Sequence, residues 1–111
     1  MTTTYRLSES MTGALALWLC AHDYTDMDAP LKLNTLVQCL CDLGVLRNPR
    51  KLIWRALNRT RIPATFPVRE AAKRALVVLA VCHPSNHWQG TVTAWIDANR
   101  PLLIAKRAIK G

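Results

Sequence analysis

The chain has 111 residues, of which 50% are apolar and 20% are charged, so it fits one globular domain over residues 1–111 and is not disordered. Its formal net charge is +8, from 15 Lys or Arg against 7 Asp or Glu. That excess favours a polyanionic partner, either nucleic acid or an acidic protein surface.

The charge is divided unevenly along the chain. Residues 1–46 hold two basic and five acidic residues, a net charge of −3, whereas residues 47–111 hold 13 basic and two acidic residues, a net charge of +11. The densest basic stretch runs from Arg47 to Arg61 and contains no acidic residue. A local field of that sign is typical of a surface that binds polyanions.

The first expected helix runs from the N-cap candidate Ser8 to about His22, and the residues from Ala14 to Ala21 make it apolar around almost its whole circumference. Such a helix is usually central in a fold. The apolar run 11–21 is too short to cross a bilayer and is not followed by a signal-peptide cleavage site. We therefore expect a cytoplasmic protein with reduced thiols and no membrane contact.

The second and third helices have clear start signals. Asp28 is an N-cap candidate for the second helix, with Pro30 in its first turn, and Gly44 is its expected C-terminal cap. Asn48 and Pro49 repeat the cap-plus-proline start, which predicts a third helix from Pro49 to about residue 60.

The rest of the chain predicts three more helices. They run from Pro67 to about Cys82, from the Ser85 cap through Ile96, and over residues 102–110. No segment shows the alternation of a β-strand. The expected fold class is therefore all-α, a compact bundle of five or six short helices.

The third helix separates two faces at about 100° per residue. One face is a stripe of Leu52, Ile53, Ala56, Leu57 and Thr60. The other face is basic and includes Trp54. Arg and Lys neutralise phosphates or read guanine edges, Asn pairs with adenine, and Trp stacks on exposed bases. The predicted nucleic-acid contacts are Arg47, Arg50, Lys51, Trp54, Arg55, Asn58, Arg59 and Arg61, with Arg69 and Lys73 as secondary points on the next helix.

The segment before the basic helix resembles the first helix and turn of a helix-turn-helix, with Gly44 at the left-handed position of the turn. The resemblance places a divergent helix-turn-helix at about residues 30–60, with a longer turn than the compact motif has. It implies that the helix after the turn contacts DNA. An ordinary solvated basic helix is the alternative, although such helices usually intersperse Glu among their basic residues.

Other functional groups are weaker candidates. Cys82, His83 and His87 form the best subset for a metal ion, but no knuckle spacing supports one, so no metal or cofactor is expected. The chain has no glycine-rich phosphate loop and no Cys-His pair suited to catalysis, so we expect no enzyme. Trp88 and Trp95 share a helix face, which suits core packing or a homodimer interface.

The sequence thus leads to two functional hypotheses. The first is a small basic nucleic-acid-binding protein, with DNA favoured over RNA, acting as a transcriptional regulator or accessory factor through the helix 49–60. The second is a non-enzymatic protein-binding module, such as a phage- or plasmid-encoded inhibitor or accessory subunit, whose basic face docks on an acidic or nucleic-acid-binding complex.

Overall fold

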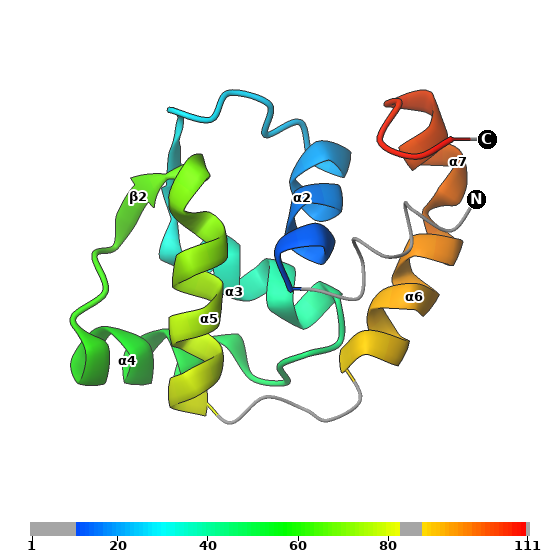
Figure 1. Ribbon diagram of the computed structural model, residues 1–111. Helices are drawn as coiled ribbons and strands as arrows, with labels where there is room; N and C mark the ends of the chain where they lie inside the picture. Colours follow the sequence, from blue (N-terminus) through cyan, green and yellow to red (C-terminus); the bar gives the residue numbers. More distant parts are fainter. Residues whose placement is uncertain (1–10, 83–87, 111) are drawn as a thin grey trace.

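A computed structural model describes residues 11–82 and 88–110 of the chain, and 65% of these described residues are helical. In chain order the described elements are α2 (Met11–Ala21), β1 (Pro30–Lys32), α3 (Leu33–Asp42), α4 (Pro49–Thr60), β2 (Thr65–Pro67), a 3-10 helix (Val68–Glu70), α5 (Ala71–Cys82), α6 (Trp88–Ala98) and α7 (Arg100–Ala105). Figure 1 shows α2 between α5 on one side and α6 and α7 on the other. The Cα radius of gyration is 13.5 Å, as expected for a compact fold of this length.

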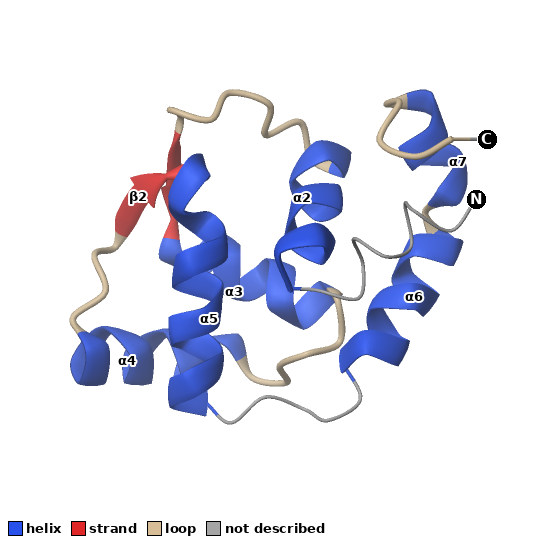
Figure 2. Ribbon diagram, in the orientation of Figure 1, coloured by secondary structure: helices blue, strands red, loops and turns tan. Residues whose placement is uncertain are grey.

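A small β-sheet corrects the all-α prediction. β1 and β2 pair antiparallel, with Leu31 opposite Phe66, and Figure 2 shows them at one edge of the molecule. Each strand buries only its middle residue, so neither is long enough to show a periodic pattern. Proline stands at the paired positions 30 and 67, where an edge strand tolerates the missing N–H.

Because of the sheet, two helices begin later in the chain than the sequence predicted. Pro30 belongs to β1, so α3 begins at Leu33, whose N–H donates to the Ala64 carbonyl at 2.7 Å. Asp28 therefore does not cap α3; its carboxylate pairs with Arg69 instead. In the same way Pro67 ends β2, and the 3-10 helix separates it from α5. Pairing between distant segments has overridden the local start signals in both cases.

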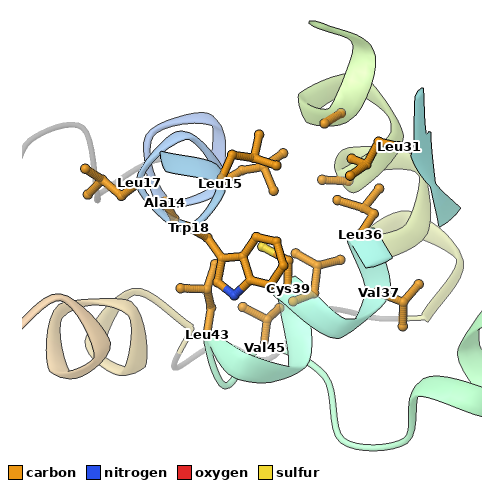
Figure 3. Packing of buried hydrophobic residues seen from close by; sticks show 14 of the residues in the cluster. Ala14, Leu15, Leu17, Trp18, Leu31, Leu36, Val37, Cys39, Leu43 and Val45 are labelled. Atoms are coloured by element: carbon orange, nitrogen blue, oxygen red, sulfur yellow. The ribbon is translucent and has the colours of Figure 1, made fainter. Parts of the chain in front are cut away.

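The core is built around α2, as its apolar composition predicted. This helix contacts α3, α5 and α7, and it buries Leu15, Leu17 and Trp18 (Figure 3). The Trp18 indole Nε1 donates to a carboxylate oxygen of Asp42 on α3 at 3.0 Å. The polar tip of this buried aromatic residue is thereby satisfied, which links α2 to α3.

The connection from α3 to α4 has the predicted chemistry. Gly44 has a φ of 79°, which a residue with a Cβ adopts only at a cost. The Asn48 side chain accepts a hydrogen bond from the Lys51 backbone N–H at 3.3 Å, and Pro49 occupies the first turn of α4. These local signals fix both ends of the connection, so α4 has the bounds that the sequence predicted.

The C-terminal helix is shorter than predicted. α7 ends at Ala105, because Arg107 adopts a φ of 60° and the Ala108 N–H returns to the Leu103 carbonyl at 2.8 Å. The tail therefore leaves the helix at Lys106, whose ammonium pairs with Asp23 beyond the end of α2.

The thiol of Cys39 provides a stability test of this core. Burial, reinforced by the negative charge of Asp42, raises the pKa of Cys39 far above its usual range. The folded state thus holds this proton more tightly than the unfolded chain, in which the thiol has a pKa of about 8.5. The free energy of unfolding is unaffected below that pH and should fall above it by about 1.4 kcal/mol per pH unit.

We expect Cys39→Ala to remove this part of the pH dependence. Urea unfolding between pH 7.5 and 9.5 measures the free energy of unfolding of both proteins. The titration of other groups cancels when one value is subtracted from the other. Equal slopes for the two proteins would show that Cys39 ionises freely in the folded state.

Candidate nucleic-acid interface

Helix α4 has the two unlike faces that its sequence predicted. Its inner side is centred on Ala56, which is fully buried, with Leu52 and Leu57 half-buried beside it. Its outer side carries Lys51 and Trp54, both exposed. The inner side packs against α3 and α5, so the outer side is the part of α4 that is open to a partner.

The basic residues of α4 and its flanks have no carboxylate partner among the described residues. This set is called the α4 basic face and consists of Arg47, Arg50, Lys51, Arg55, Arg59 and Arg61, all exposed except the half-buried Arg55. The ion pairs of the described chain involve other cations, namely Arg69 with Asp28, Arg74 with Glu70, Arg100 with Asp97, and Lys106 with Asp23. The positive charge of the α4 basic face is therefore uncompensated in the described protein, which favours an external anion.

The described acidic residues are all engaged elsewhere. Four of them form the ion pairs above. Asp26 accepts a hydrogen bond from the Asp28 backbone N–H at 2.9 Å, and Asp42 accepts from Trp18 and from Gln38, the latter at 2.9 Å. No described carboxylate thus forms an ion pair with a cation of α4.

Arg61 completes the face at an unusual backbone position. It follows α4 with φ 55° and ψ 36°, the left-handed conformation that glycine adopts without steric cost. A residue with a Cβ costs about 1 kcal/mol there. The position places a cation at the negative end of the helix dipole and extends the row of positive charge beyond the last turn.

Two predicted contacts lie apart from this face. Arg69 is tied to the loop before β1, because its backbone N–H donates to the Met27 carbonyl at 3.0 Å and its guanidinium pairs with Asp28. Lys73 is exposed on the first turn of α5. Figure 1 shows that this turn lies near β2, whereas α4 crosses the other end of α5. The structure does not bring Arg69 or Lys73 onto the α4 basic face.

Trp54 is the most exposed large apolar side chain of the described residues, with 70% of its surface open to solvent. It is therefore not buried against another helix of the described fold. The neighbouring Asn58 donates one amide N–H to the Trp54 carbonyl at 2.8 Å. Its side-chain oxygen and second N–H remain available to a ligand.

The sequence did not predict the surface between α3 and α4. A hollow of about 370 Å³ is lined by Trp18, Asn34, Thr35, Gln38, Pro49, Arg50 and Ile53. A second hollow of about 330 Å³ is lined by Lys32, Leu33, Asn34, Ile53, Leu57, Ala64 and Thr65. The two hollows share Asn34 and Ile53, so they adjoin; together they are called the α3–α4 groove. The spacing of Asn34 and Gln38, one helical turn apart on α3, is a sequence signal that could have indicated it.

No metal centre is found in the part of the chain that the structure describes, where no three His, Cys, Asp or Glu residues are grouped to hold an ion. Cys39 and Cys41 lie on α3, and both thiols have a pKa raised mainly by burial. His83 and His87, together with the side chain of Cys82, lie outside the described residues, so a metal there stays untested.

Of the two tryptophans on the predicted dimer face, Trp88 and Trp95, the structure describes the side chain of Trp95 alone. Trp95 on α6 is half-buried and packs against the core, which is the packing alternative for this residue. The side chain of Trp88 lies outside the described residues. A homodimer through this face therefore remains a prediction.

Comparison with known proteins does not indicate a function for this chain. No protein-family model, curated protein or solved structure matches this chain. Within residues 11–82 and 88–110, none of the helices combines the length and apolarity needed to span a bilayer. The functional assignment therefore rests on the residues themselves.

Proposed function

We propose that this chain is a small nucleic-acid-binding protein that contacts DNA through α4. The observation that carries the proposal is the α4 basic face, whose six cations are gathered on one helix and its flanks without a described carboxylate partner. Phosphates supply the compensating charge, and their binding releases counterions from the nucleic acid.

Different positions on α4 have different roles in this proposal. Arg47, Arg50, Arg59 and Arg61 hold phosphates, because they flank the outer face. Lys51, Arg55 and Asn58 contact base edges or backbone from its middle. In the helix-turn-helix version of the proposal, α3 and the Gly44 turn support α4 as the contacting helix. The protein is then a cytoplasmic regulator or accessory factor and not an enzyme.

The exposed indole of Trp54 favours a second candidate function. Tryptophan and arginine dominate the energetic centres of protein interfaces. A module that docks the same basic face on an acidic protein surface would use Trp54 as its apolar anchor and the six cations for steering.

A salt titration tests the nucleic-acid proposal. We expect fluorescence anisotropy with a labelled DNA duplex to give a log affinity that falls with log salt at a slope of about −4 to −5, since each phosphate contact contributes about −0.9 and four to six cations make one. Arg59→Ala should make the slope shallower by about one, because it removes one phosphate contact.

Lys110→Ala is the matched control, because it removes one exposed cation from the far end of the chain. It should leave the slope unchanged. A failure to bind duplex, single-stranded DNA and RNA at about 0.05 M salt, where phosphate contacts are strongest, would reject the proposal. Capture of a partner that persists after nuclease treatment would then support the protein-docking candidate.

A further inference from the structure

We infer that the α3–α4 groove is a channel for single-stranded DNA, in which Trp54 stacks on a base while the α4 basic face holds the phosphates. The inference rests on the proposed function, because it names the form of nucleic acid that the same helix binds. It adds residues from α3 and β1 that the sequence did not predict, namely Lys32, Asn34, Thr35 and Gln38.

The position of Trp54 connects the groove with the cations. Arg50, Trp54 and Leu57 follow the i, i+4, i+7 spacing of one helix stripe. Arg50 and Leu57 each line one of the two hollows. Lys51 and Arg55 lie on the opposite side of Trp54 around the helix. Trp54 itself lines neither hollow, but its position on α4 lies between the groove-lining residues and most of the positive charge, so that a base and its phosphate would lie on either side of the indole.

The exposed indole favours a single strand over a duplex. Stacking on tryptophan requires a free base face, and the bases of a duplex already stack on one another. An indole also has a single N–H donor, which makes it a poor reader of base edges in the major groove. Proteins that bind single strands combine a basic row with an aromatic platform, and α4 has both.

The lining of the groove suits the edges of unpaired bases. Asn34 and Gln38 provide amides and Thr35 provides a hydroxyl, so donors and acceptors are both present. Each hollow has one cation in its lining, Arg50 in the first and Lys32 in the second. Hollows of about 370 and 330 Å³ lie within the size range of small-ligand sites, about 300–1,000 Å³, so each accommodates a nucleobase.

The apolar residues of the groove favour DNA. Ile53 and Leu57 are half-buried and line the groove next to Trp54. The C5-methyl group of thymine makes apolar contacts with such side chains. Uracil lacks that methyl group, so a thymine-containing strand gains a contact that its RNA equivalent does not.

Anisotropy with a labelled oligo(dT) strand tests the inference. We expect the protein to bind oligo(dT) more tightly than a duplex of equal length at about 0.15 M salt, where weak phosphate contacts are screened. Trp54→Ala should weaken oligo(dT) binding about 5- to 150-fold, the range measured for one stacked base. Trp54→Phe should restore most of the loss, because phenylalanine keeps an aromatic face.

Leu76→Ala is the matched control, since Leu76 is 56% exposed on α5 and lies in neither hollow. It should bind oligo(dT) as the parent does. Because Trp54 and Leu76 are both exposed, all three variants should remain folded, with a thermal midpoint by circular dichroism close to that of the parent, which separates lost binding from lost folding.

Replacement of oligo(dT) with a deoxyuridine strand tests the methyl contact and should lower the affinity. Tighter binding of duplex, with no effect of Trp54→Ala, would overturn the inference and leave the proposed function standing. Tighter binding of oligo(rU) would overturn the assignment to DNA. Absence of binding to every nucleic acid would overturn the inference and the proposed function together.

Discussion

Replacement of Arg50, Arg55 and Arg59 with glutamine is expected to lower the affinity for DNA about 100-fold at about 0.15 M salt. Each phosphate contact contributes a counterion-release factor of about five at that salt concentration. The Arg55 contact, to a base edge or to the backbone, is worth at least as much, so the three losses multiply to about 100-fold. Glutamine keeps the helix propensity of α4 and adds no negative charge. None of the three arginines has a described carboxylate partner, so the fold should lose little stability.

Glutamine at Lys106, Arg107 and Lys110 is the control for this result. It removes the same charge, from +8 to +5, but at the C-terminal tail. The tail pairs with Asp23 through Lys106, and an exposed pair of this kind contributes about 0–1 kcal/mol. If both triple variants lose affinity equally, net charge and not the α4 basic face drives binding.

Leu36→Ala is expected to lower the free energy of unfolding by about 2–5 kcal/mol, the range for a buried leucine that leaves a cavity. Leu36 is fully buried on α3, within the cluster that joins this helix to α2 and β1 (Figure 3). Such a loss is a large fraction of the total stability of a domain, about 5–15 kcal/mol. Urea unfolding followed by circular dichroism measures it.

Leu76→Ala serves as the exposed counterpart, because it removes the same atoms from a side chain that is 56% exposed. Its cost should stay below about 1 kcal/mol, since little apolar area is uncovered. Comparable losses at positions 36 and 76 would contradict the packing of α3 in the core. A Leu36→Ala protein that remains folded should also retain DNA affinity, because Leu36 does not line the groove.

The helices that the sequence predicted best are those with complete local signals. α4 has an asparagine cap, a proline in its first turn and an amphipathic pattern, and the structure gives it the predicted bounds. α2 was recognised as central because its residues are apolar around almost the whole helix. Signals of this kind lie within a few residues of one another, so a linear sequence contains them.

The features that the sequence missed depend on distant partners. β1 and β2 are three residues each and are separated by two helices, so only their pairing defines them. The pair between Asp23 and Lys106 joins residues 83 apart in the sequence. Predictions that treated Asp28 and Pro30 as a helix start were wrong because they could not include Arg69 and β2.

The sequence by itself determined the charge asymmetry, the helical class and the position of the basic helix, since composition and short-range periodicity are properties of the linear chain. Only the tertiary structure decided that Arg69 pairs with Asp28 and Lys106 with Asp23, because these two ion pairs form between distant segments. It alone left Trp54 uncovered and placed Asn34 beside Ile53 to form the groove. Exposure and concavity arise from the packing of helices against one another, and no local pattern of residues specifies them.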